Sequence, residues 1–186
     1  VNLSELNAAG PEVLFALHSL LDRHRKLELP NGEVLSLRED TYIFGTMNPT
    51  SLRDYAGTQS LNKAFADRWV IWDKPFPNKV QLDEIFNKRY PKLQKEYKEL
   101  IIKLATEINN SFMSDDISIN IETPMSLRTI VERIPIGLDV YANSTDPLKD
   151  TWENFVLPHV NKEDLDHYKT LWNTIVRKGP SIKPKL

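Results

Sequence analysis

The sequence contains no cysteine. Disulfide bonds, thiolate metal sites and cysteine nucleophiles are therefore excluded together. No apolar run approaches the roughly 18 residues of a membrane-spanning helix, and no secretory signal peptide opens the chain. These features are typical of a reducing compartment, and we expect a cytoplasmic location. Because the chain opens on Val1 rather than on methionine, we also expect a processed or excised fragment.

An excess of either charge is also missing. The 186 residues include 24 Lys and Arg against 26 Asp and Glu, which gives a formal net charge of -2. This balance leaves no overall electrostatic footprint for nucleic acid or for a membrane surface, so neither is expected as a partner. The length suffices for one full domain or two small ones.

Glycine is scarce, with six residues, and no glycine-rich phosphate loop of either standard pattern occurs. The histidines show no spacing typical of a metal site, and no Ser/His/Asp arrangement stands out. Residues that could carry chemistry therefore have to be sought at the ends of the predicted strands.

The chain divides into an α/β part and a helical part, with Pro75 and Pro77 marking a linker. Over residues 1–76 the apolar spacing predicts, in order, a strand stub at 1–3, a helix over 13–21 that Pro11 opens, a hairpin over 26–37 turning at Asn31-Gly32, a buried strand beginning at Tyr42, and a short helix closing on 67–69. Over residues 77–186 it predicts helices at 81–89, 91–112, 123–141, 147–156 and 161–176, a loop or marginal strand at 117–121, and a frayed tail from Arg177. Pro135 should kink or divide the helix that contains it.

Two polar residues follow the predicted strands of the α/β part. Glu5 stands where ligands of open α/β sheets bind, so its carboxylate could orient a water for attack on a γ-phosphate or reach Mg²⁺. The side-chain amide of Asn48 could contact both the phosphate and that water. The plainer interpretations are an acidic loop residue for Glu5 and a turn-forming residue before proline for Asn48.

Two arginines could complete such a site. Arg68 could present its planar guanidinium to a developing phosphate charge, in its own site or in that of a neighbouring subunit. Its plainer interpretation is a surface ion pair with Asp67 or Asp73. Arg128, at the start of a helix in the second part, could reach the same ligand from a lid, or could be an exposed helix residue.

The order of these features resembles the second half of an AAA+ ATPase module of the MoxR and dynein-related branch, with a likeness to the small, ATPase subunit of cobaltochelatase and its relatives. The segments that carry the resemblance are Ser4–Leu14 (Walker B strand end and helix), the Asn31-Gly32 hairpin, Phe44–Pro49 (sensor 1), Tyr55–Gln59 and Ala66–Trp69 (up to the arginine finger), and Ser126–Arg128 (sensor 2). The resemblance is specific from residue 4 to about residue 76. It implies a P-loop NTPase core of class α/β, partial over residues 1–76, followed by an all-helical lid over residues 77–186.

The resemblance also implies roles. Glu5 would polarise water, Asn48 would position it, Arg68 would act on the next subunit's nucleotide, and Arg128 would report that nucleotide to the lid. The family normally has Asp where Ser4 stands, and that Asp helps to hold Mg²⁺.

The function implied is ATP hydrolysis, with ATP and Mg²⁺, in a homo-oligomeric ring, expected to be a hexamer, that remodels a client protein. Because the Walker A loop is absent from the sequence, we expect this chain alone to be inactive as an ATPase. Two alternatives stay open: a degenerate, non-catalytic interaction module that assembles with active subunits and donates Arg68, and a helical nucleic-acid-binding domain.

Overall fold

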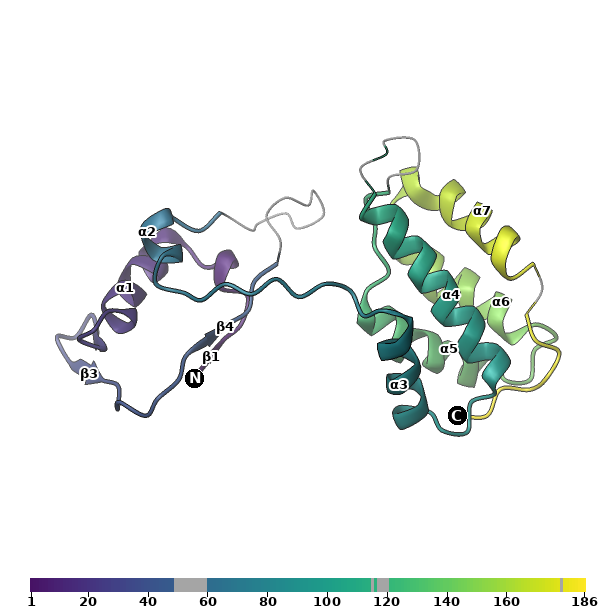
Figure 1. Cartoon of the computed structure of the whole chain (residues 1–186), viewed down its shortest axis with the longest axis horizontal. Coiled ribbons are helices and arrows are strands. Elements are labelled where there is room, and N and C mark those ends of the chain that lie inside the picture. Colours follow the sequence, from purple (N-terminus) through teal and green to yellow (C-terminus); the bar gives the residue numbers. More distant parts are fainter. Residues whose placement is uncertain (49–59, 115, 117–120, 178) are drawn as a thin grey trace. The chain divides into compact units, whose positions relative to one another are not determined.

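The structure is a computed structural model of the chain, and it describes residues 1–48, 60–114, 116, 121–177 and 179–186. It divides the chain into two compact units, Val1–Lys74 and Pro75–Leu186 (Figure 1). Each unit has its own hydrophobic core. Three parts of the sequence predictions lie outside the described residues: Pro49 at the end of the Phe44–Pro49 segment, 55–59 and 117–120.

The first unit contains a short parallel strand pair. Strand β1 (Asn2–Leu3) lies beside β4 (Phe44–Gly45) in parallel register, with Leu3 opposite Gly45. The predicted strands are confirmed, but the prediction that the second is buried is wrong, because Phe44 is 66 % exposed. Parallel strands become buried when other strands and helices cover them. Within the described residues, β4 pairs with β1 alone.

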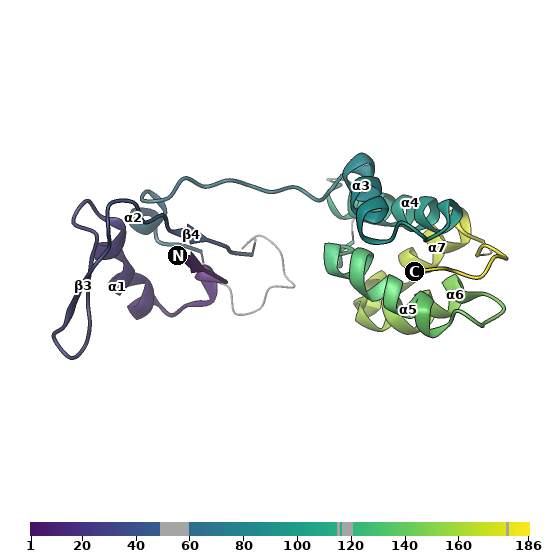
Figure 2. The same cartoon turned by 90° about the horizontal axis from the view of Figure 1, so that it is seen from below.

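A helix and a hairpin follow β1. The 3₁₀ helix η1 (Leu6–Ala8) leads into α1 (Pro11–Leu21), which has proline in its first turn as predicted. Strands β2 (Lys26–Glu28) and β3 (Val34–Ser36) then form the predicted antiparallel hairpin. Gly32 has a φ of 83° at its tip, a conformation that glycine adopts without strain. Figure 2 shows the hairpin as a long narrow loop beside α1.

The core of the first unit is small. Helix α2 (Lys63–Ala66) begins at Asn62, whose side chain accepts a hydrogen bond from the Ala64 amide, and it contributes the fully buried Phe65. Phe65 packs with Leu6 and Leu14, so the core joins η1, α1 and α2. The unit therefore rests on few apolar contacts.

The described part of the second unit is built from helices. These are α3 (Lys79–Arg89), α4 (Lys95–Phe112), the π-helical turn η2 (Thr129–Arg133), α5 (Ile134–Val140), α6 (Pro147–Thr151), the π-helical turn η3 (Trp152–Val156), the 3₁₀ turns η4 (Leu157–His159) and η5 (Lys162–Asp164), and α7 (Leu165–Ile175). The predicted helices are confirmed. Pro135 lies in the first turn of α5, directly after η2, and the predicted division is confirmed as a change from π to α geometry. Each helix in the described residues is too short or too polar to cross a lipid bilayer.

The core of the second unit forms around α4. Its buried stripe includes Tyr97, Ile101 and Ile108, spaced so that they share one face of the helix. The same core contains an aromatic cluster, in which the Trp152 ring stacks on the Trp172 ring with ring centroids 5.1 Å apart. Figure 1 shows α4 and α7 side by side, and they make one of the larger helix contacts of the chain.

The tail departs from the prediction of a frayed end. Residues 179–186, here called the strap, pass the amino-terminal end of α4 and are fixed there (Figure 1, yellow). The Tyr97 hydroxyl donates to the Ile182 carbonyl at 2.7 Å, and Pro184 is buried. The prediction was wrong because the strap is held by side chains more than 80 positions earlier in the chain, which no local pattern reveals.

Candidate functional site

The first candidate site is the edge where β1 and β4 end. The carboxyl ends of parallel strands lie at the same edge of a sheet, where open α/β folds bind ligands. Beyond the strands the ladder continues, with the Leu6 amide donating to the Thr46 carbonyl at 2.8 Å and the Glu5 amide to the Thr46 hydroxyl at 3.4 Å. This edge therefore brings together Glu5 and the segment that ends in Asn48.

Asn7 ties the two strand ends together. Its side chain is fully buried, its Nδ2 donates to the Asn48 carbonyl at 2.8 Å, and its Oδ1 accepts from the Asn48 amide at 3.3 Å. These bonds use the backbone of Asn48, and within the described residues no hydrogen bond engages the side-chain amide of Asn48. Sequence reasoning missed Asn7, because an asparagine in a loop carries no signal that it is buried.

Glu5 has an unusual backbone. Its φ of 55° and ψ of 45° are left-handed, which costs a non-glycine residue about 1–2 kcal/mol. Such strain persists where the surroundings impose it, and it is frequent at functional sites. The residue is exposed, and no hydrogen bond or ion pair to another described residue engages its carboxylate. The carboxylate is therefore available to a ligand.

Ser4 is exposed next to Glu5. Among the described residues no three His, Cys, Asp or Glu side chains gather closely enough to hold a metal ion. Mg²⁺ commonly binds proteins through one or two carboxylates and takes its other oxygens from water and from substrate phosphates. The Ser4 hydroxyl and the Glu5 carboxylate fit one part of such a shell, and a bound nucleotide would have to complete it.

Arg68 lies elsewhere in the first unit. Its Nε donates to Oδ1 of Asp22 at 2.7 Å, and its Nη1 donates to the Ala64 carbonyl. The expected ion pair is thus present, but with Asp22 rather than with Asp67 or Asp73. This guanidinium also lowers the pKa of the Asp22 carboxyl from its ordinary value. In the described residues no hydrogen bond or ion pair joins Arg68 to the edge formed by Glu5 and Asn48.

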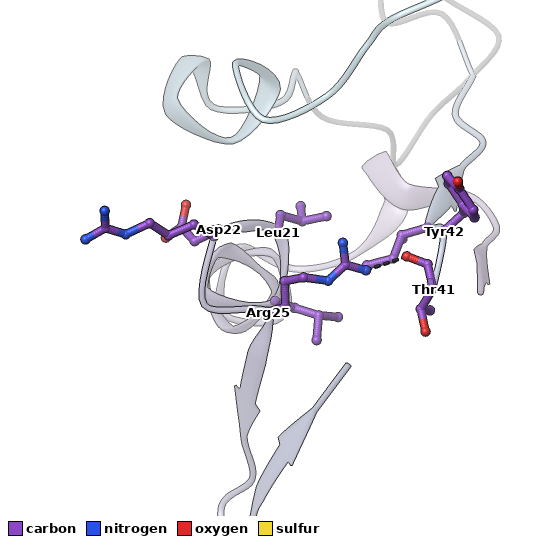
Figure 3. Close-up of a pocket in the computed structure, with 8 residues that line it drawn as sticks. Leu21, Asp22, Arg25, Thr41 and Tyr42 are labelled. Carbon is purple, nitrogen blue, oxygen red and sulfur yellow. Dashed lines mark hydrogen bonds between the residues drawn. The ribbon is translucent and has the colours of Figure 1, made fainter. Parts of the chain in front are cut away.

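A pocket of about 310 Å³ lies at the same end of α1 as Asp22 (Figure 3). Its wall is formed by Leu20, Leu21, Asp22, Arg23, Arg25, Thr41, Tyr42 and Ile43. Figure 3 shows the Arg25 side chain reaching across to the Thr41 carbonyl, which it binds. The pocket is separate from the strand edge and adjoins the partner of Arg68.

Arg128 belongs to the second unit. It precedes η2, is exposed, and makes no hydrogen bond or ion pair with another described side chain. The nearby Ser126 hydroxyl accepts a hydrogen bond from the Thr129 amide at 3.1 Å and so fixes the start of this helix. Four of the five predicted residues thus lie in the first unit, and two of these, Glu5 and Asn48, meet at one edge.

Comparison with known proteins shows similarity to one named domain family and to several individual proteins. Residues 1–69 match the family model of the AAA domain of the dynein-related subfamily. These residues are therefore similar to an AAA domain. The chain is also similar to two proteins named midasin: that of Giardia intestinalis is 30% identical over 146 residues, 73% of this chain, and that of Dictyostelium discoideum is 39% identical over 90 residues, 48% of this chain.

The similarity covers very different shares of the relatives. The chain spans 3% of the Giardia protein and 2% of the Dictyostelium protein. It also matches an uncharacterized protein, YojN, of Bacillus subtilis, with 26% identity over 119 residues, or 61% of this chain and 38% of that protein. All three of these matches, at 48%, 61% and 73% of the chain, are longer than the first unit.

Proposed function

We propose that the chain is the carboxyl-terminal part of an AAA+ ATPase module of the MoxR and dynein-related branch. Its first unit would be part of the α/β core, and its second unit the helical lid. The complete protein would hydrolyse ATP within a ring, expected to be a hexamer, and would use the subunit motion to remodel a client protein. A cytoplasmic location remains part of this proposal.

The observation that carries the proposal is the strand edge. Parallel pairing of β1 and β4 and the two bonds from Asn7 bring Glu5 and Asn48 to one edge, each with a side chain available to a ligand. A carboxylate that orients water and an amide that contacts a phosphate are the parts that phosphoryl hydrolysis needs at one place. The match of residues 1–69 to the AAA domain supports ATP and Mg²⁺ as the ligands.

The proposed roles follow the resemblance. Glu5 polarises the attacking water, Asn48 positions it, and Ser4 offers one oxygen to Mg²⁺. Arg68 acts on the nucleotide of the neighbouring subunit, in keeping with its place at Asp22 rather than at the strand edge. Arg128 reports the nucleotide from the lid.

The experiment uses rings of the complete protein with two variants, Glu5→Gln and Arg68→Ala. Each variant alone should lose most of its ATPase activity. Mixed rings should recover a measurable part of it, because an intact Glu5 in one subunit can meet an intact Arg68 from the next. Arg23→Ala, which removes an exposed arginine of the same unit, is the matched control and should stay active. No recovery on mixing would refute the role of Arg68 in a neighbouring site.

The 186-residue chain by itself should not hydrolyse ATP, because the sequence holds no glycine-rich loop to bind the phosphates. Phosphate release from Mg-ATP by the purified chain measures this directly. Robust turnover that Glu5→Gln abolishes would refute the proposal.

A second candidate is a non-catalytic module that assembles with active AAA+ subunits and donates Arg68 to them. Two observations favour it: Ser4 stands where the family normally has Asp, and Arg68 makes its contacts away from Glu5. The same rings discriminate between the two candidates. In the second one, Glu5→Gln leaves ATPase activity unchanged while Arg68→Ala reduces it.

A further inference from the structure

The backbone at Arg68 is fixed by the core of the first unit. Helix α2 ends at Ala66, and the Arg68 amide donates a hydrogen bond to the Phe65 carbonyl at 3.2 Å. Phe65 is fully buried, and the Trp69 ring packs against it edge to face, with ring centroids 6.0 Å apart. Arg68 therefore lies between two aromatic residues that are held in place, which leaves only its side chain to be positioned.

Two acceptors hold the Arg68 guanidinium. Its Nε donates to Oδ1 of Asp22 at 2.7 Å, and its Nη1 donates to the Ala64 carbonyl. A guanidinium carries five N–H donors in a rigid plane, so these two bonds fix its orientation and leave the other donors unused. Nη2 makes no hydrogen bond with any other residue that the structure describes. The two terminal nitrogens therefore keep donors for a bidentate contact with a phosphate.

Asp22 is itself fixed at the end of α1. It follows the last residue of this helix, its amide donates to the His18 carbonyl at 3.0 Å, and the preceding turn contributes the buried Leu20. Its side chain is 43% exposed and that of Arg68 is 28% exposed. An ion pair this exposed adds modestly to folding stability, but it restricts the rotamers of the arginine.

We propose that Asp22 is a positioning residue for Arg68: it holds the guanidinium so that the two terminal nitrogens can meet a phosphate of the nucleotide in the neighbouring subunit. This inference rests on the proposed function and adds a residue to it. An arginine side chain has many rotamers, and losing them on binding costs free energy, so prior ordering by Asp22 removes part of that cost. The carboxylate engages Nε, which a phosphate contact through the terminal nitrogens does not need.

The first measurement is steady-state ATP hydrolysis by rings of the complete protein. Asp22→Ala should lower kcat about tenfold and leave KM for ATP unchanged, because Arg68 acts on charge that develops in the transition state. Asp22→Asn keeps a neutral acceptor for Nε and should lower kcat less, by about threefold. Asp67→Ala is the matched control and should keep the activity of the parent. The Asp67 carboxylate adjoins Arg68 in the sequence and is exposed, but it makes no ion pair with Arg68 in the described part of the chain.

Mixed rings test whether Asp22 acts through Arg68. Asp22→Ala mixed with Glu5→Gln should recover activity, because an intact Glu5 of one subunit then meets an intact Asp22 and Arg68 of the next. Asp22→Ala mixed with Arg68→Ala should not recover, because every interface then lacks one of these two side chains. A subunit whose fold is damaged would also lose its own Glu5 site, so it would not recover with Glu5→Gln. If Asp22→Ala subunits do not enter rings, the kcat and KM of Asp22→Asn decide.

The inference is overturned if Asp22→Ala keeps the activity of the parent, if it fails to recover with Glu5→Gln, or if it recovers with Arg68→Ala. A gain of activity would overturn it as well, since Asp22 would then compete with the nucleotide for Arg68. The mixture of Glu5→Gln with Arg68→Ala tests the proposed function separately. If that mixture recovers while Asp22→Ala behaves like Asp67→Ala, the role of Asp22 alone is refuted. If that mixture does not recover, both the role of Asp22 and the role of Arg68 in a neighbouring site are refuted.

Discussion

Replacing Asn7 with alanine should loosen the strand edge that holds Glu5 and Asn48. The substitution removes two hydrogen bonds, of 2.8 and 3.3 Å, and leaves the amide and the carbonyl of Asn48 unpaired. Each lost bond is worth about 1 kcal/mol, and a buried group left unpaired costs about 1–3 kcal/mol more. The Asn48 groups are partly buried, so water can replace some of the lost bonding. We expect Asn7→Ala to destabilise this unit by about 2–4 kcal/mol.

Native-state amide hydrogen exchange measures this locally. The amides of Leu6 and Thr46 belong to the parallel ladder beside Asn7. A loss of about 2–4 kcal/mol should reduce their protection by about 30-fold to 1000-fold. Ser19→Ala, at an exposed position of α1, is the control and should leave both amides protected.

A size-matched variant separates the hydrogen bonds from the loss of volume. Asn7→Asp keeps an acceptor for the Asn48 amide but places a carboxylate against the Asn48 carbonyl, so it should be at least as harmful as Asn7→Ala. If the protection of Leu6 and Thr46 falls no further in either Asn7 variant than in Ser19→Ala, then Asn7 does not hold this edge together.

Three further predictions concern individual side chains. Asp22→Asn should lower the melting temperature at pH 7, because the Arg68 guanidinium lowers the pKa of the folded Asp22 and stabilises its charged form. The difference from the parent should begin to shrink as pH falls below the ordinary carboxyl pKa of about 4 and should vanish as pH falls through the lowered pKa of the folded state. A difference that does not shrink on acidification would contradict this. Burial raises the pKa of Tyr97 to about 12. The contribution of the neutral Tyr97 side chain to the free energy of unfolding should therefore be complete below pH 10 and should be lost as pH rises towards 12. Burial also raises the pKa of Tyr168, so tyrosinate absorbance during an alkaline titration should show more than one late tyrosine, and Tyr97→Phe should remove one of them. Asp164→Asn should destabilise the second unit by about 1–3 kcal/mol, because the buried carboxylate accepts hydrogen bonds from the amides of Glu122 and Thr123. Thermal melts followed by near-ultraviolet circular dichroism of the tryptophans measure this loss of stability. Melting curves that superimpose on those of the parent would refute the prediction.

Local patterns were sufficient to predict most elements of the fold. Apolar spacing and the Asn31-Gly32 turn located the helices and the hairpin because these depend on neighbours in the sequence. Exposure was harder to predict. The apolar run that begins at Tyr42 has the composition of a buried strand, but burial depends on what covers a strand, and Phe44 is largely exposed.

The candidate site could be predicted only in part. Glu5 and Asn48 were identifiable because each follows a strand, and parallel pairing then brings them to one edge. The roles of Asn7 and Asp22 depend on contacts across 41 and 46 positions of the chain, respectively. No spacing rule links residues so far apart. For the same reason the sequence predicts a frayed tail where the structure has the strap.

The π-helical turn η2 places one extra residue between Arg128 and Leu138, which is anchored in the core. A π turn closes its hydrogen bonds over five residues instead of four, so it makes about one revolution with one residue more than an α turn. Deleting one residue within Thr129–Arg133 would therefore restore α geometry and leave Arg128 facing in nearly the same direction relative to Leu138. The helix can thus lose a residue at this point without reorienting Arg128.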